Sequence, residues 1–151
     1  MDKLDCEILE ALKENARASA SEISRRVSLS VPAVSERIRK MEQSGIIEKY
    51  TVRVGRKAAG YHLMAFIFVT IATVSRSTFF QEQIVLDPCV LECHAIAGPN
   101  DYLLKVLVRD TDELEHFLSH TLKNIDGVVA VNTIIRLSTM KEELNIQQMP
   151  L

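Results

Sequence analysis

The side chains best suited to chemistry in this chain are basic and small polar residues around positions 30 to 40. Arginine and lysine bind phosphates, and arginine, serine and glutamate also hydrogen-bond the edges of bases. Small side chains ahead of them would let a helix approach a DNA groove closely. With two arginines from the preceding segment, the candidate DNA contacts are Arg25, Arg26, Ser30, Val31, Pro32, Ala33, Ser35, Glu36, Arg37, Arg39 and Lys40. The alternative is a charged helix face that only meets solvent.

The charge of the chain is unevenly distributed, and this favours DNA contact. The whole chain has a formal net charge of −2 and a pI near 6.1, which by itself argues against a nucleic-acid-binding protein. Residues 17–57, however, hold 10 basic and 4 acidic residues, a net charge of +6 (10 − 4). An excess of this kind matches a phosphate footprint. We therefore expect one end of the molecule to bind duplex DNA.

A second candidate site is the loop from Gly98 to Tyr102. Gly98, Pro99, Asn100 and Asp101 are turn-forming residues, so a plain hairpin turn is one interpretation. The other is a binding site, because Asn100, Asp101, Tyr102 and free backbone amides could together recognise the ammonium and carboxylate of a small amino acid.

The elements that must position the first set of residues are two short helices around a tight turn. Ser19 and Glu22 form a capping box at the start of the first helix. Ser30 is a suitable N-cap for the second, and Gly45 supplies the left-handed residue that ends it. A preceding helix over 4–15 and a β wing over 46–54 complete a winged helix-turn-helix domain over residues 1–54.

The second half follows a β- and α-periodic pattern after a linker at 55–62. Strands are predicted at 64–74, 90–97, 102–108 and 128–137, and helices at 77–86 and 111–124. This βαββαβ order predicts a ferredoxin-like domain over 63–138, followed by a tail at 139–151, and an α+β fold for the chain. The first strand is apolar on both faces, so a second copy of the chain is expected to cover the face that the helices leave open.

Cysteines offer little for a metal site. Cys89, Cys93 and His94 are close in sequence, but two-residue alternation favours a strand with Cys89, Leu91, Cys93 and Ala95 on one face. A four-ligand zinc site would need more donors nearby. We expect structural cysteines and no metal.

The histidines form no acid–base constellation either. His116 and His120 are four residues apart and could form a metal pair, but the glutamate of a metalloprotease motif is missing, and a helix surface pair is simpler. We therefore predict that the protein is not an enzyme and has no cofactor beyond a small effector. A small-molecule-binding or enzymatic role for the second half remains the alternative, because the ferredoxin-like fold hosts many chemistries.

The longest apolar run, Leu63 to Val74, is too short to span a bilayer, and Met1 leads directly into a helical pattern without a secretory leader. The sequence therefore predicts a soluble cytoplasmic protein without a membrane partner.

Several motifs in the right order resemble the Lrp/AsnC family of transcription regulators. The resemblance covers residues 2 to about 140. Its residues are Leu4-Asp5, Ile8-Leu9, Leu12, Asn15-Ala16-Arg17, Ser19, Glu22-Ile23, Leu29-Ser30, Val34-Ser35, Arg37-Ile38, Glu42, Ser44-Gly45-Ile46-Ile47, Gly98-Pro99-Asn100-Asp101-Tyr102 and Ile125-Asp126-Gly127-Val128.

The resemblance implies a winged helix-turn-helix joined to a βαββαβ regulatory domain. It implies dimers formed through the sheets, assembly of dimers into octamers, and an effector, often an amino acid, bound between dimers. Matched by position, the resemblance implies that Gly98, Asn100, Asp101 and Tyr102 lie at the effector cleft, with Pro99 and Asn100 at the variable positions of the loop and Thr133 on the last strand as a further candidate. An architectural DNA-binding protein without an effector is the remaining alternative.

Overall fold

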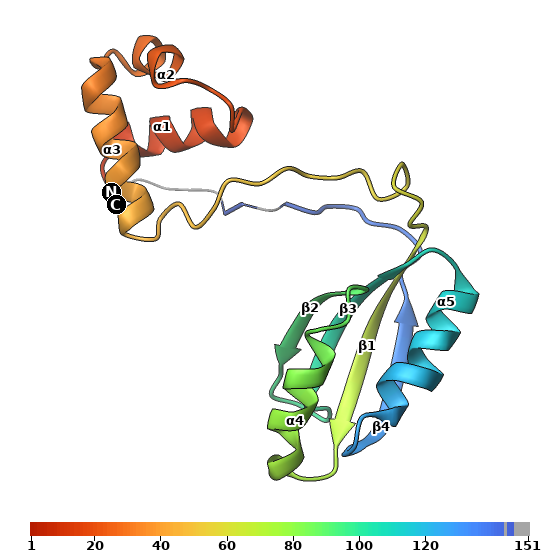
Figure 1. Ribbon diagram of the computed structural model, residues 1–151. Helices are drawn as coiled ribbons and strands as arrows, with labels where there is room; N and C mark the ends of the chain where they lie inside the picture. The colour runs from red at the N-terminus through yellow and green to blue at the C-terminus, as the bar shows by residue number, and fades with distance from the viewer. Residues whose placement is uncertain (144, 147–151) are drawn as a thin grey trace. The chain divides into compact units, whose positions relative to one another are not determined.

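The computed structural model describes residues 1–143, 145 and 146, which form two compact units. The first unit contains Met1–Arg53 and the described residues after Met140, and the second contains Val54–Met140 (Figure 1). The predicted tail over 139–151 therefore lies partly outside the described residues. We describe each unit by itself.

The first unit is built on three helices, α1 (Lys3–Glu14), α2 (Ala20–Val27) and α3 (Val31–Gln43). The predicted caps are confirmed: Ser19 and Glu22 form a capping box on α2, and the Ser30 side chain accepts from the Ala33 amide at the start of α3. Between the two helices, Ser28 takes a left-handed conformation with φ of 54°, which turns the chain in only three residues. Gly45 after α3 has φ of 76°, as expected.

One apolar stripe from each helix fills the core of this unit. Ile8, Ile23 and Val34 are almost fully buried, one on each helix. Met41 continues the stripe of α3, and Ile38 packs against the cluster while half-exposed. Because Val34, Ile38 and Met41 face inward, the positions between them on α3 must face outward.

The segment 46–54 contains no strand, so the predicted β strand of the wing is not formed. Val52 and Val54 are exposed, and among the described residues no backbone ladder partners this segment. A single extended segment without a paired neighbour does not make a sheet. The Tyr50 hydroxyl instead donates to Glu42 Oε1 over 3.0 Å and ties the segment to α3. Partial burial beside that carboxylate raises the pKa of Tyr50 to about 12.

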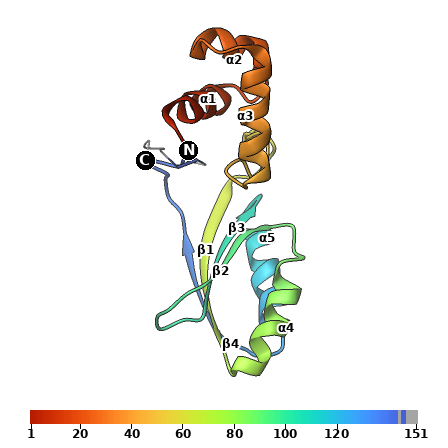
Figure 2. The same ribbon diagram turned by 90° about the vertical axis from the view of Figure 1, so that its left-hand side faces the viewer.

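The second unit is a four-stranded antiparallel sheet with strand order β2-β3-β1-β4. The elements are β1 (Leu63–Ile71), α4 (Val74–Ile84), β2 (Val90–Ala95), β3 (Tyr102–Val108), α5 (Thr111–His116) and β4 (Val128–Ile135). The predicted helix at 111–124 is confirmed only in part, because α5 continues as a π-helical turn at Phe117–Thr121 and a 3-10 turn at Leu122–Asn124. Both helices cover the same face of the sheet (Figures 1 and 2).

Alternation along β1 separates the two faces of the sheet. Ala65, Ile67 and Val69 are fully buried under the helices, where Phe80 of α4 and Leu122 complete the core. The outer face carries Phe66 and Phe68, both half-buried, and no described helix covers it. The predicted two-sided apolar character of this strand is therefore confirmed.

The alternation predicted for the cysteine-containing strand is confirmed for Cys89, Cys93 and Ala95, which lie on the core side, and is wrong for Leu91. A register shift between Val90 and Glu92 places Val90 opposite Val106 and Cys93 opposite Leu104, both core residues. The extra residue of such a bulge puts Val90 on the core side at the position where alternation predicts Leu91. Leu91 is consequently exposed instead of sharing the face of Cys93.

Residues 55–62 are folded as a turn of the second unit, although the sequence predicted a linker. The Ala59 amide donates to the Gly55 carbonyl over 3.0 Å, and the Tyr61 amide donates to the Arg56 carbonyl over 2.9 Å. Gly60 has φ of 87°, a conformation that favours glycine. This turn lies before β1, so it brings basic residues to one end of the sheet.

Candidate DNA-binding and effector-binding sites

The outward face of α3 presents a compact set of polar and basic side chains. Its first turn exposes Val31 and Pro32, and Ala33 is half-buried. On the next turn Ser35 and Glu36 are exposed, and on the turn after that Arg39 and Lys40 are exposed. Their spacing of three and four residues places them on one side of the helix, opposite Val34 and Met41. Most of the predicted DNA contacts on α3 are therefore brought together.

Ion pairs organise the basic end of this face. Arg39 donates to Glu36 through Nε over 2.9 Å and through Nη2 over 2.6 Å, and Lys40 Nζ lies 3.8 Å from the same carboxylate. The hydrogen bond from Arg39 holds the pKa of Glu36 below its usual value and raises that of Arg39. All three side chains remain about half-exposed or more. Such surface pairs are weak, so DNA can replace the carboxylate as the partner of Arg39.

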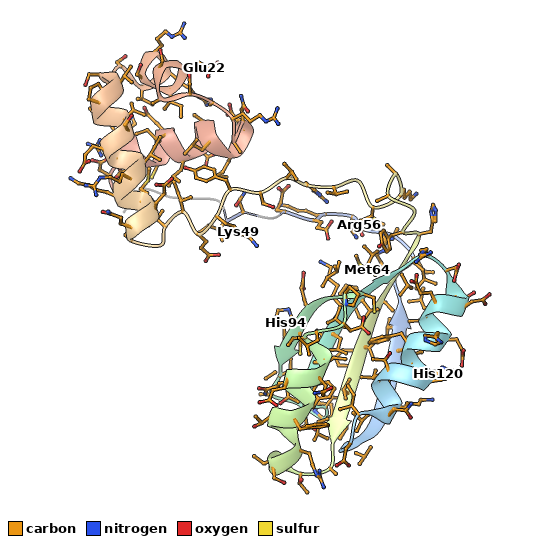
Figure 3. All side chains as sticks on the ribbon, in the orientation of Figure 1. Glu22, Lys49, Arg56, Met64, His94 and His120 are labelled. Atoms are coloured by element: carbon orange, nitrogen blue, oxygen red, sulfur yellow. The ribbon has the colours of Figure 1, made fainter. Side chains whose placement is uncertain are left out.

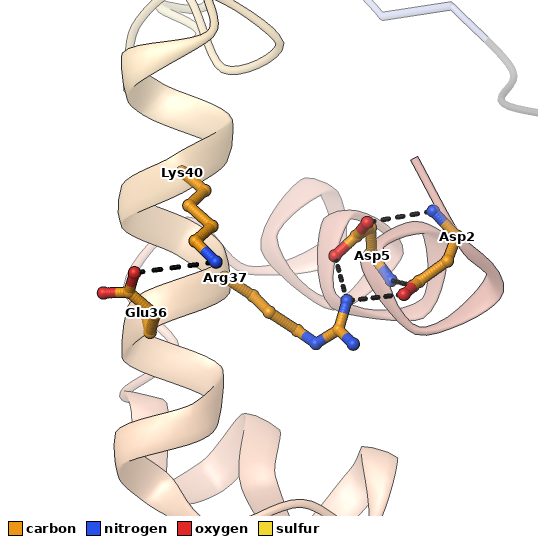
Figure 4. Close-up of polar contacts among 5 residues, drawn as sticks. All are labelled: Asp2, Asp5, Glu36, Arg37 and Lys40. Atoms are coloured by element: carbon orange, nitrogen blue, oxygen red, sulfur yellow. Dashed lines mark hydrogen bonds and ion pairs between the residues drawn. The ribbon is translucent and has the colours of Figure 1, made fainter.

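Arg37 lies away from this face and joins α3 to the start of α1. Its Nη1 donates to Asp2 Oδ2 over 2.8 Å and to Asp5 Oδ1 over 2.6 Å (Figure 4). The side chain of Arg37 is 30% exposed, and that of Asp5 is 17% exposed. Asp2 and Asp5 also form the capping box of α1. This box was not predicted, although an aspartate three residues after an N-cap residue is a signal of one. Contact of Arg37 with DNA stays a prediction, and it would require breaking this clamp.

We expect Arg37→Gln to lower the Tm by about 2–4 °C at pH 7, because both charge-assisted hydrogen bonds are lost. The hydrogen bond from the Asp5 amide and the contact with Arg37 lower the pKa of Asp2. A carboxyl group whose pKa is lowered by folding stabilises the folded protein at pH values above its ordinary pKa of 3.8. This stabilisation is lost as the pH falls through the lower pKa that the group has in the folded protein. The difference in Tm between wild type and variant should therefore shrink below about pH 4. Circular dichroism melts at pH 7 and pH 3.5 measure it, and a difference that grows in acid would contradict the clamp.

The two candidate arginines of α2 are partly engaged within the first unit. Arg26 makes a two-pronged pair with Glu14 of α1, at 2.5 and 2.9 Å. Arg25 Nε donates to the Ser21 carbonyl over 3.2 Å, and its side chain lies on the surface. Arg26 therefore links α2 to α1 through an exposed ion pair, which contributes little stability, while the described contact of Arg25 is with a carbonyl oxygen, so that Arg25 is the better placed of the two to meet a phosphate.

The loop between β2 and β3 uses its polar side chains for internal hydrogen bonds. Asp101 Oδ2 accepts from the Ile71 amide over 2.7 Å, and the Asp101 amide donates to the Val69 carbonyl over 3.0 Å. Asn100 Nδ2 donates to Thr70 Oγ1 over 3.0 Å. These bonds fix the loop to the end of β1. They join segments that are far apart in the sequence, so the turn-forming residues of the loop did not predict them. Gly98, Pro99 and Asp101 are the exposed residues of the loop, Asn100 is half-buried and Tyr102 is buried.

Tyr102 and Thr133 lie on the helix-covered face of the sheet. Tyr102 is buried, its hydroxyl accepts from Gln81 Nε2 over 2.7 Å, and its ring packs on Phe80 with centroids 4.8 Å apart. Thr133 is paired with Ile67 on the other side of β1 from Tyr102. A single protomer therefore does not join Thr133 to the loop in one cleft.

The described residues contain no candidate metal centre with three or more protein ligands. No such group of their histidine, cysteine, aspartate or glutamate side chains lies close enough together to hold an ion. Burial raises the pKa of the Cys89 and Cys93 thiols, which suits unreactive packing residues. His116 and His120 stack on the helix surface with ring centroids 4.5 Å apart. Within the described chain, no helix is both long and apolar enough to cross a membrane.

Comparison with known proteins finds the same two parts. Residues 1–48 match a family model described as winged helix-turn-helix DNA-binding, and residues 64–146 match one described as Lrp/AsnC ligand binding domain. The transcriptional regulator AzlB of Bacillus subtilis is 30% identical over 148 residues, which cover 97% of this chain and 94% of that protein. The HTH-type transcriptional regulator FL11 of Pyrococcus horikoshii is 32% identical, over 94% of this chain and 93% of that protein.

Solved structures agree in fold over nearly the full length. A transcriptional regulator from Neisseria meningitidis, solved as a complex with L-Met, superposes with a TM-score of 0.92 at 31% identity, covering 97% of this chain and 96% of that one. AsnC of E. coli superposes with a TM-score of 0.90 at 29% identity, covering 95% and 96%.

Proposed function

Because the chain belongs to the Lrp/AsnC family of DNA-binding transcription regulators, we propose that it binds DNA through the outward face of α3 and responds to an amino-acid effector. The observation that carries the DNA contact is the set of exposed side chains from Ser35 to Lys40 on a helix capped at both ends and packed on α1 and α2. Small residues in the first turn would approach the bases, and Arg39 and Lys40 would reach phosphates or base edges.

We propose that two chains act together through the outer face of the sheet. Phe66, Phe68 and Leu103 are half-buried there, and Ile134 is 49% exposed, although no described helix covers them. Apolar side chains in such a row are stabilised when a second copy removes them from water. A two-fold pair would present two α3 helices to half-sites about 34–36 Å apart on the same side of duplex DNA. Assembly of dimers into octamers belongs to this proposal as well.

The effector site is proposed at the loop from Gly98 to Tyr102, with Thr133 supplied by a neighbouring chain. In one protomer a ligand can meet the exposed residues Gly98, Pro99 and Asp101, while internal hydrogen bonds hold Asn100 and the buried Tyr102 in place. The likeness to a regulator solved with L-Met supports an amino acid as the ligand class. Binding at a boundary between chains would favour one assembly over others, and this would couple the effector to DNA affinity.

A thermal-shift screen with the twenty standard amino acids, L-Met included, tests the effector, and light scattering on the same samples tests assembly. We expect at least one amino acid to raise the Tm by about 3–6 °C at ten times its Kd. Asn100→Ala should reduce that shift, while Lys123→Ala, an exposed change in the same unit, should keep it. No shift with any amino acid, together with DNA binding that lacks sequence preference, would favour an effector-independent architectural protein.

We further propose that the protein works in the cytoplasm, since its DNA target is there in bacteria and archaea, and that it carries no catalytic activity. The second point rests on its relatives, which are transcription regulators.

A further inference from the structure

Two histidines of the second unit, His116 and His120, form a pair on a helix surface that the proposed function does not use. Both side chains are exposed. Their rings are nearly parallel, with an interplanar angle of 14° and centroids 4.5 Å apart. Figure 3 marks the place of the pair at His120. Imidazole is the commonest side-chain ligand of metal ions and suits zinc, copper and nickel. The pair is therefore a candidate chelate for a divalent transition-metal ion.

The backbone between the two histidines explains why their rings lie above one another. After His116 the helix α5 continues as the π-helical turn Phe117–Thr121, and the Leu122 amide reaches the Phe117 carbonyl, five positions earlier. An α-helix completes a turn in about 3.6 residues, so residues four apart are rotated past one another. A π-helical turn is wider and takes more residues, so His120 lies more directly over His116. Single π-helical turns are rare and are frequent at functional sites.

The separation of the rings suits one ion bound by both. A metal ion lies about 2.0–2.1 Å from each imidazole nitrogen that binds it, so the two nitrogens are at most about 4 Å apart. Rings with centroids 4.5 Å apart reach that separation by small rotations of the side chains. Because the backbone already holds the rings together, binding requires little further ordering. The second nitrogen then binds intramolecularly, which makes the pair a much tighter ligand than either histidine alone.

The charged neighbours along the helix leave the pair as a two-ligand chelate. Glu115, next to His116, accepts a hydrogen bond from Ser119 Oγ over 2.7 Å. Asp112 and Lys123, which lie about one turn before and one turn after the pair, are exposed and of opposite charge. Within the described chain no three donor side chains are close enough to hold an ion, so the protein supplies two imidazoles and water fills the other positions.

We propose that His116 and His120 together bind one divalent transition-metal ion, of the nickel, copper and zinc class, through one ring nitrogen each. The site goes beyond the proposed function, because it uses neither α3 nor the loop at 98–102. The ion would join successive turns of the helix across the π-helical turn. Phe117 and Leu122 are buried in the core of the second unit, so an ion that holds this turn in place would stabilise the unit.

The test titrates the full chain with nickel chloride at about pH 7.5, where free imidazole is largely uncharged. Isothermal titration calorimetry measures the number of ions bound and their Kd. Magnesium chloride is the reference, because Mg²⁺ prefers oxygen ligands. We expect one Ni²⁺ per chain at a site that His116→Gln and His120→Gln each weaken about 100-fold, since either change removes the chelate. At ten times its Kd, nickel should also raise the Tm of the wild type by about 3–10 °C, and both variants should lose this shift.

His62→Gln is the matched control, because it removes an exposed histidine that precedes β1 and should bind nickel as the wild type does. Nickel held by other residues is common to all four proteins and cancels in the comparison. Both histidines of the pair are exposed, so neither substitution should disturb folding. Independent binding by the two histidines would keep the wild-type Kd in each single variant and lower only the number of ions. That result, or nickel binding that is the same in all four proteins, would overturn the chelate.

Discussion

Replacing Arg39 with glutamine is expected to weaken DNA binding about 10- to 100-fold while leaving the fold intact. Arg39 is 52% exposed on the outward face of α3, and within the described part of the chain its hydrogen bonds go to Glu36 alone. A base or phosphate contact is worth about 1–3 kcal/mol. The substitution also leaves Glu36 without its two-pronged partner, so a carboxylate would then face the phosphates and add repulsion to the lost contact.

Fluorescence anisotropy measures this effect, with a duplex that the wild-type protein selects from a random pool. Arg109→Gln is the matched control, because it removes the same charge from an exposed arginine of the second unit. Circular dichroism melts should be the same for all three proteins within about 1–2 °C, since surface pairs contribute little stability. If Arg39→Gln binds as tightly as Arg109→Gln, the outward face of α3 is not the reading surface. Relaxed preference at one base pair would identify a base contact, and a lower salt slope would identify a phosphate contact.

Gly127→Ala is expected to destabilise the second unit by about 2–5 kcal/mol. Gly127 has φ of 97°, where an L-residue is strained by about 1–2 kcal/mol. A Cβ at this position would also lie 2.5 Å from Cβ of Arg76, near the start of α4. Cβ of Arg76 is not the flexible end of a side chain, so the helix or the turn must move, and overpacking of this kind costs about 1–3 kcal/mol. The Gly127 carbonyl accepts from the Ala72 amide over 2.8 Å, which ties this turn to the end of β1.

The expected result is a fall in Tm of about 5–15 °C, and it is measured by thermal and urea unfolding. Gly98→Ala is the control, because a Cβ there would meet no atom within 4 Å and the backbone is not left-handed. That change should alter the Tm by less than about 2 °C. Equal stability of both variants would show that the turn at Gly127 relaxes freely.

Much of the candidate DNA site follows from the sequence because its causes are local. The capping box of Ser19 and Glu22, the N-cap at Ser30 and the left-handed Gly45 all act within a few residues. The same holds for the apolar stripe of Val34 and Met41, since helix geometry alone decides which side chains share a face. These local rules locate the outward face of α3 without any knowledge of the rest of the chain.

The ion-pair partners of individual charged side chains on α3 could not be predicted in the same way. Arg37 is bound by Asp2 and Asp5, which lie 35 and 32 positions earlier in the chain. Helical periodicity predicted Arg37 on the outward face, and only the packing of α1 beside α3 shows that its side chain turns toward Asp2 and Asp5. The predicted wing strand failed for a related reason: a strand needs a partner, and periodicity within 46–54 cannot supply one.

By itself, the sequence determined the helix-turn-helix, the βαββαβ order and the two-sided apolar character of β1, because caps, turns and periodicity depend on neighbours in the chain. Only the tertiary structure decided the partners of the polar groups: Asp101 on the Ile71 amide, Tyr102 on Gln81, and Arg37 on Asp2 and Asp5. It also decided the bulge that exposes Leu91. Each of these depends on which distant segments lie side by side, and an ion pair or hydrogen bond forms with whatever acceptor the packed backbone brings within reach.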